Sequence, residues 1–227
     1  MSVRRELQRI LAQIRKLRLR RRIGERWSEG NGFSARVYPD YATYLMHQST
    51  KLPAMRARTL EHHDERFYSA LRERITALGM TLLAKPVLCL AARQGTEVRV
   101  FRDQGAFAVG IDLEPGRANE FVTRGDFHSL QFANSAVAIV FTNSMDHAFD
   151  PDRMMGEVRR VLTPEGLFIV EVGSGTATDF GKGAYESFAW KTIEDLLPRL
   201  LAHGFTLQHR TSFTVPWSGE QLVLQKS

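Results

Sequence analysis

The sequence predicts an α/β fold built on a mostly parallel, doubly wound sheet of seven strands that ends in an antiparallel edge pair. Two observations lead to this prediction. Short apolar runs alternate with helical periodicity between residues 87 and 202, which is the pattern of parallel strands covered by helices on both faces. The last two apolar runs, 205–213 and 221–225, have no helix between them, so we expect them to pair antiparallel at one edge.

The stretch 87–116 is the organising unit of this prediction. An apolar strand at 87–90 leads into a small-residue turn at 91–95 and then into a helix with apolar residues at helical spacing. A second strand, 107–111, ends on the acid Asp112. A turn of this kind brings backbone close to a ligand at a helix start, and an acid in this place reaches ribose hydroxyls. The unit therefore predicts a site for a nucleotide-like ligand.

The other elements follow in the same alternating order. We expect helices at about 60–79, 151–162 and 193–202, strands at 120–124, 136–142 and 167–172, and a turn at 163–166. Asp150 is suited to cap the second of these helices. Residues 27–60 are irregular by pattern and are interpreted as a wrapping segment with short helical turns, able to cap a ligand pocket, whose tyrosines pack. We divide the chain into a basic helix with wrapping segment, 1–59, and a main domain, 60–227.

The net positive charge of the chain comes from its first 26 residues. Residues 1–26 hold ten Lys or Arg and two acids, whereas the remainder holds 21 basic and 23 acidic residues. Residues 3–23 predict a helix with an apolar stripe between arginine-rich faces. Three interpretations stay open: self-association or docking on the main domain, contact with anionic lipid or an acidic partner, and contact with nucleic acid, which is least supported because no base-reading motif accompanies the charge.

Composition narrows the classes of protein further. Apolar residues make up 43% of the chain, which suits a globular protein of one α/β domain plus an appendage. The single cysteine, Cys89, falls inside a predicted strand and indicates a small core residue in a reduced, cytoplasmic protein. No signal peptide and no apolar run long enough to cross a membrane is expected. His62, His63 and Asp64 are interpreted as capping and solvent-facing residues, and no metal site is expected.

Four motifs between residues 125 and 170 are specific enough to indicate a family. The stretch GDFHSLQFANSAVAIVFTNSMDHAFDPDRMMGEVRRVLTPEGLFIV resembles that of class I S-adenosylmethionine-dependent methyltransferases of the small single-domain type. It contains the Gly-Asp-x-x-x-Leu-x-Phe, a buried strand, the His-x-x-Asp and the Glu-x-x-Arg-Val-Leu-x-Pro-x-Gly turn in the family's order. The resemblance covers about 60–227 and implies a Rossmann-like sheet and S-adenosylmethionine as cofactor.

The resemblance also implies which residues bind the cofactor. Ala91, Ala92, Arg93 and Gly95 would run beneath its methionine portion. Asp112 would bind the ribose, with Leu113 beside the adenine, and Asp126 would accept from the adenine amino group while the Phe127 backbone faces the ring. Asn143 and Ser144 would line the pocket near the transferred methyl group. His128 is interpreted as a surface residue beside the adenine.

A general base is needed only when the methyl acceptor is a hydroxyl, because the sulfonium methyl is already activated. His147 is the best-placed candidate and Asp146 the second. The alternative for His147 is a histidine that simply packs.

The first glycine motif departs from the family. Cys89 stands in place of an acid, Ala91 and Arg93 stand in place of two glycines, and Gly95 alone remains. Two outcomes stay open: a loop of different shape that still binds the cofactor, or a loop whose affinity for the cofactor is reduced or lost. We favour binding, because Asp112 and Asp126 are both kept, and Arg93 is suited to meet a carboxylate.

The leading hypothesis is methyl transfer from S-adenosylmethionine to a small-molecule, glycan or lipid-linked acceptor in the cytoplasm, with peripheral membrane contact as a variant. The alternative is a catalytically silent subunit that recruits a partner or membrane through residues 1–26. A nicotinamide-dependent dehydrogenase is disfavoured, because the Gly-x-Gly-x-x-Gly turn is missing.

Overall fold

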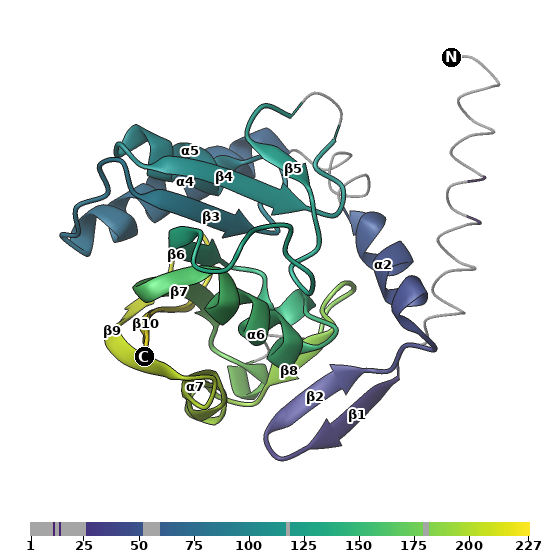
Figure 1. The fold of residues 1–227 in the computed structure, drawn as a ribbon. Coiled ribbons are helices and arrows are strands. Elements are labelled where there is room, and N and C mark those ends of the chain that lie inside the picture. Colours follow the sequence, from purple (N-terminus) through teal and green to yellow (C-terminus); the bar gives the residue numbers. More distant parts are fainter. Residues whose placement is uncertain (1–10, 12–13, 15–25, 52–59, 117–118, 179–181) are drawn as a thin grey trace.

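The computed structural model describes residues 11, 14, 26–51, 60–116, 119–178 and 182–227 (Figure 1). The predicted helix at 3–23 lies outside these residues apart from two positions. The main sheet has the strand order β5-β4-β3-β6-β7-β10-β9. Its members are β3 (Pro86–Leu90), β4 (Phe107–Asp112), β5 (Val122–Arg124), β6 (Val137–Thr142), β7 (Leu162–Gly173), β9 (Phe205–Phe213) and β10 (Gly219–Lys226).

This topology confirms the predicted fold class. Strands β3 to β7 pair in parallel, whereas β10 pairs antiparallel with both β7 and β9. The chain first builds outward from β3 to β4 and β5 and then returns to the other side of β3 with β6 and β7. The order of strands therefore reverses at β3, and the carboxyl ends of β3, β4 and β6 meet where ligands bind in open α/β sheets.

Alternation along β3 separates two hydrophobic cores. Val87 and Cys89 pack toward α4 (Leu60–Ala77) and α5 (Thr96–Asp103), while Leu88 and Leu90 pack toward α6 (Pro151–Val161) and α7 (Ile193–Leu201). The sheet thus lies between two layers of helices (Figure 1). Cys89 is fully buried, as predicted for a small core residue.

The caps of the helices follow from local sequence. Asp150 accepts a hydrogen bond from the backbone N–H of Arg153 and so caps α6 as predicted. Thr192 and Asp195 form a reciprocal capping box at the start of α7. Both helices are thereby capped at their amino-terminal ends.

Within the predicted wrapping segment 27–60, the described residues 27–51 are more regular than expected. They form a hairpin, β1 (Trp27–Gly30) and β2 (Phe33–Arg36), followed by the helix α2 (Tyr41–Ser49). The hairpin makes a second, three-stranded sheet with β8 (Phe188–Trp190), an element that the sequence pattern did not indicate (Figure 1). Strands of three or four residues are too short for their alternation to be recognised.

Two smaller features complete the fold. The predicted turn at 163–166 lies within β7, where the pairing register with β6 shifts between Val137 and Ile139 and Glu165 has a φ of 59°. Among the described residues, no helix combines the length and the apolar character needed to cross a membrane.

Candidate active site

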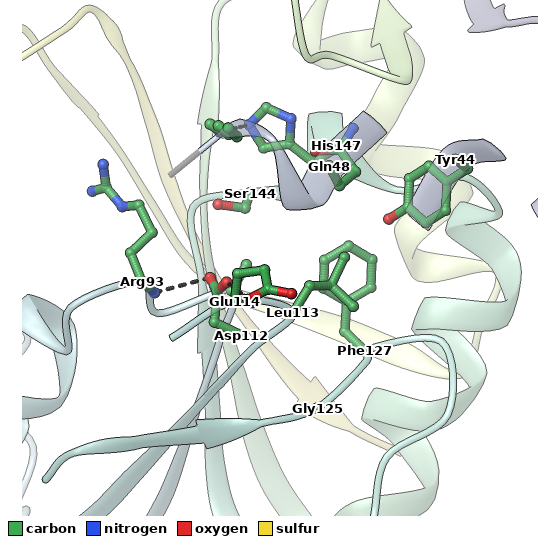
Figure 2. A pocket seen from close by; sticks show the side chains of 12 residues that line it. Tyr44, Gln48, Arg93, Asp112, Leu113, Glu114, Gly125, Phe127, Ser144 and His147 are labelled. Carbon is green, nitrogen blue, oxygen red and sulfur yellow. Dashed lines mark hydrogen bonds between the residues drawn. The ribbon is translucent and has the colours of Figure 1, made fainter. Parts of the chain in front are cut away.

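A cavity lies at the carboxyl ends of β3, β4 and β6, where the strand order reverses. It holds about 580 Å³ of empty space, part of it open to solvent. Figure 2 shows Tyr44 and Phe127 close together on one side, Arg93 on the other, and His147 across the cavity from Asp112. The lining residues are Tyr44, Gln48, Lys51, Ala91, Arg93, Asp112, Leu113, Glu114, Gly125, Phe127, Ser144 and His147.

The loop after β3 keeps a left-handed backbone at the positions where the family pattern has glycines. The φ angles are 53° at Ala91, 44° at Arg93 and 86° at Gly95. A side chain at Gly95 would place its Cβ 2.7 Å from the Cβ of Phe121, so only glycine fits there. Ala91 and Arg93 therefore hold a conformation that residues with a Cβ seldom adopt, and such a conformation costs about 1–3 kcal/mol.

Asp112 is fixed at the end of β4 by backbone donors. Its Oδ2 accepts from the N–H of Arg93 at 3.0 Å, and its Oδ1 accepts from the N–H of Glu114 at 2.9 Å (Figure 2). Each carboxylate oxygen has a further lone pair available, because a carboxylate offers about four acceptor positions. The carboxylate is thus held in place and can still accept hydrogen bonds from a ligand in the cavity.

Asp126 is linked to its neighbours and is not among the residues that line the cavity. Tyr41 on α2 donates to its Oδ2 at 2.5 Å, and the backbone N–H of His128 donates to its Oδ1 at 2.9 Å. Burial raises the pKa of Asp126, but the hydrogen bonds from His128 and Tyr41 outweigh burial and hold the pKa below its ordinary value.

His128 is buried, so its interpretation as a surface residue was wrong. Its Nε2 accepts the backbone N–H groups of Phe149 and Asp150, both at 3.2 Å. Because Nε2 is an acceptor, Nδ1 carries the proton and donates to Asp126 Oδ1 at 3.0 Å. His128 therefore joins the loop after β5 to the start of α6, a role that its position beside Asp126 did not reveal.

His147 lies in the short 3-10 helix Met145–His147 that follows β6. Its Nδ1 lies 3.0 Å from the carbonyl oxygen of Tyr185, which can only accept, so Nδ1 carries the proton. Its Nε2 is thus an acceptor, and it contacts the Nζ of Lys51. Burial, followed by the positive charge of Lys51, lowers the pKa of His147 to about 3.

Several ionisable side chains lie around His147. Burial lowers the pKa of Lys51 to about 8, although the negative charges of Asp146, Glu186 and Asp112 oppose that effect. Burial raises the pKa of Asp146 to about 6. Asp146, His147 and Glu186 each offer a ligand atom within 4.8 Å of the others, a grouping that the sequence did not predict. The amine of Lys51 already brings a positive charge to this grouping, which disfavours a second cation there.

Glu97, at the start of α5 directly after the loop 91–95, is a buried acid that no sequence motif marked. Among the described residues, neither carboxylate oxygen of Glu97 has a hydrogen-bond partner, and burial raises the pKa of this group to about 7. Asp64, interpreted as solvent-facing, is in fact buried and lies 3.9 Å from the guanidinium of Arg93. The side chains of His62 and His63 lie outside the described part of the structure.

The structure brings together seven of the twelve predicted site residues at the cavity: Ala91, Arg93, Asp112, Leu113, Phe127, Ser144 and His147. The predicted residues that do not line it are Ala92, Gly95, Asp126, Asn143 and Asp146. Five lining residues were missed: Tyr44, Gln48, Lys51, Glu114 and Gly125. The first three belong to the segment with no readable motif, while Glu114 and Gly125 directly neighbour predicted residues.

Comparison with known proteins identifies the central part of the chain. Residues 88–170 match the family model of the methyltransferase domain. This match begins in β3 and ends within β7, so it contains the loop 91–95, Asp112 and His147. It excludes β1, β2, α2 and β8. No curated protein matches the chain.

Solved methyltransferases share the fold. The Burkholderia thailandensis 1,6-didemethyltoxoflavin-N1-methyltransferase, with bound 1,6-didemethyltoxoflavin and S-adenosylhomocysteine, has 16% identity and a TM-score of 0.64, covering 88% of this chain and 98% of that one. A chain of the complex between the Haloferax volcanii Trm112 methyltransferase activator and a methyltransferase has 16% identity, a TM-score of 0.61, and coverage of 78% and 97%. A Mesorhizobium loti S-adenosylmethionine-dependent methyltransferase has 14% identity, a TM-score of 0.55, and coverage of 68% and 96%.

Proposed function

We propose that the chain is a class I S-adenosylmethionine-dependent methyltransferase and that it transfers the methyl group of S-adenosylmethionine to a small-molecule acceptor. The observation that carries this proposal is the Asp112 carboxylate, held by two backbone N–H groups on one wall of a cavity whose opposite wall carries His147. One end of the cavity thus suits a nucleoside, and the other suits proton chemistry.

The residues of the cavity fit the cofactor. Asp112 would accept from the ribose hydroxyls, while Leu113, Phe127 and Tyr44 supply apolar surface for an adenine ring. The loop that carries Ala91 and Arg93 follows the left-handed course of a glycine-rich turn, so its backbone approaches the cavity despite the substitutions. When bound, the cofactor supplies an activated methyl group attached to a positively charged sulfur.

The protein's own contribution is alignment, exclusion of water and control of one proton. Helix α2 covers the cavity with Tyr44 and Gln48, and Gln48 is held in place by donating to the Tyr185 carbonyl at 2.7 Å. The cavity holds about 580 Å³ of empty space, part of it open to solvent, which is a size typical of small-molecule sites and supports such an acceptor over the glycan and lipid-linked acceptors that the sequence leaves open. The Nε2 of His147 contacts the Nζ of Lys51, so a hydroxyl nucleophile would meet this histidine–lysine pair.

Calorimetric titration with S-adenosylmethionine and S-adenosylhomocysteine tests this proposal. We expect both to bind, whereas NADH, which also carries an adenosine but needs a pyrophosphate-binding turn, does not. If neither S-adenosyl compound binds at high micromolar concentration, the proposal fails, and the catalytically silent subunit becomes the better description of the chain.

A further inference from the structure

Lys51 enters the cavity from outside the methyltransferase match. It follows α2, within the segment between the N-terminal hairpin and the first helix of the main domain, and its side chain lines the cavity with Gln48 and His147. This side of the cavity faces away from the part formed by Leu113 and Phe127 (Figure 2). The lysine therefore belongs to the portion of the cavity left for an acceptor.

The amine of Lys51 has one direct polar partner among the described residues, the Nε2 of His147. Asp146, Glu186 and Asp112 attract the amine and Arg93 repels it, but none of the described carboxylates lies within ion-pair distance. A partly buried ammonium without a contacting carboxylate is under-compensated, and an incoming anion relieves that deficit. The site is thus prepared for a negatively charged group.

His147 determines which nitrogen carries the proton in its contact with Lys51. Its Nδ1 proton is committed to the Tyr185 carbonyl at 3.0 Å, and that carbonyl is also held by Gln48 at 2.7 Å. Its Nε2 can only accept, so the shared proton of the pair resides on the lysine nitrogen. The histidine therefore orients the Lys51 amine beside the cavity, and this amine is charged at neutral pH because its pKa is about 8.

We propose that Lys51 and His147 form the acceptor subsite, and that the acceptor is a small molecule with an acidic hydroxyl, a phenol or enol, bound as its oxyanion against the Lys51 ammonium. This inference rests on the proposed function. The hydroxyl proton leaves to the solvent when the acceptor binds. The acceptor oxygen then forms the new O–C bond while the S–C bond breaks, and that bond's electron pair stays on the sulfur, which becomes neutral.

The chemistry of the subsite favours oxygen over nitrogen. An amine acceptor would place its nitrogen beside the Lys51 ammonium. That ammonium repels the protonated form of the acceptor amine and cannot act as a base to deprotonate it. An oxyanion gains a charge-assisted hydrogen bond in the bound state. The methylated product is a neutral ether that lacks this attraction, so the subsite binds the product more weakly than the acceptor.

The test uses 4-nitrophenol as the probe, because its phenolate absorbs visible light and its phenol does not. In the full chain saturated with S-adenosylhomocysteine, we expect the bound probe to be ionised, with affinity at least about tenfold above that of 4-nitroanisole. Lys51→Met should lower the phenolate affinity about tenfold or more, whereas Lys51→Arg, which keeps the charge, should retain most of it. Lys85→Met, at an exposed lysine far from the cavity, is the matched control.

The outcomes separate the two proposals. If S-adenosylhomocysteine fails to bind the unmodified chain, the proposed function fails. If it binds equally to the unmodified chain and to Lys51→Met, but the probe binds as the phenol, binds no better than 4-nitroanisole, or binds equally to both proteins, the acceptor inference alone is overturned. Loss of phenolate binding at unchanged S-adenosylhomocysteine affinity supports it. Turnover with S-adenosylmethionine should then bleach the phenolate absorbance and produce 4-nitroanisole.

Discussion

The hydroxyl of Tyr41 donates to the carboxylate of Asp126 over 2.5 Å, which ties helix α2 to the loop after β5. The same hydroxyl lies 2.9 Å from Nδ1 of His128, and His128 in turn accepts the backbone N–H groups that lead into α6. One short chain of hydrogen bonds therefore joins three segments around the cavity. It also explains why Asp126 is held away from the cavity surface.

Tyr41→Phe should lower the free energy of unfolding by about 1–3 kcal/mol at neutral pH, because it removes a partly buried hydrogen bond to a charged group. The folded pKa of Asp126 is depressed, so the stability it contributes is present above its unfolded pKa and lost as the pH falls through the lower folded value. The effect should therefore shrink in acid. Urea unfolding at neutral and acidic pH measures this. Tyr68→Phe, which removes an exposed bond to Asp103, is the control, and equal losses at both positions contradict the prediction.

Asp112→Asn should weaken S-adenosylhomocysteine binding by about tenfold or more, because an amide has one acceptor atom where the carboxylate has two. The backbone N–H groups of Arg93 and Glu114 compete for that atom, so a loss of about 1 kcal/mol in unfolding free energy should accompany the change. Isothermal titration and thermal unfolding measure the two effects. Asp103→Asn, at an exposed acid on α5, should change neither, and unaltered affinity in Asp112→Asn would show that this acid does not hold the ribose.

Glu97 should make the protein less stable as the pH rises. Its folded pKa is raised to about 7, so the folded state keeps a proton that the unfolded state loses above pH 4.5. The free energy of unfolding should fall between these two pH values by up to about 3 kcal/mol and then level off. Glu97→Gln should remove this slope, whereas Glu73→Gln, at an exposed position, should retain it. Unfolding curves from pH 5 to pH 8 decide the matter, and parallel slopes in all three proteins refute it.

In the loop 91–95, replacing glycine by alanine and alanine by glycine should change the free energy of unfolding by unequal amounts. Gly95→Ala should cost more than about 2 kcal/mol, because its Cβ would collide with Phe121 at a φ of 86°. Ala91→Gly should change stability by less than about 1 kcal/mol, because the relief of a left-handed alanine offsets the greater freedom of the unfolded chain. Differential scanning calorimetry distinguishes the two, and comparable losses would mean that residue 91 is not strained.

The sheet was predictable because its signals are local and strong. The run at 136–142, the Asp150 cap and the final pair of strands each depend on neighbouring residues, and each is observed close to its expected place. The second sheet was not predictable, since β2 and β8 pair only because the domain brings residues 33–35 to residues 188–190. Short strands carry too little alternation to be read without that context.

For the same reason, only some of the residues that line the cavity were predictable. Asp112 and Leu113 follow from the end of a recognisable strand, and both line the cavity. Lys51 and Gln48 come from a segment without a motif, so nothing local marks them. Burial also reversed two interpretations, because His128 and Asp64 are polar residues whose partners lie far along the chain: His128 bonds to Asp150, and Asp64 faces Arg93.

The pairing of the N-terminal hairpin with β8 has a consequence for biosynthesis. Arg36 donates to the carbonyl of Glu186 at 2.8 Å, across 150 residues of sequence. Strands β1 and β2 leave the ribosome early but gain their partner only when β8 emerges, after the whole parallel part of the main sheet. The hairpin is therefore among the last parts to settle, and a nascent chain stalled before residue 188 would carry Asp112 while β2 still lacks its second neighbouring strand.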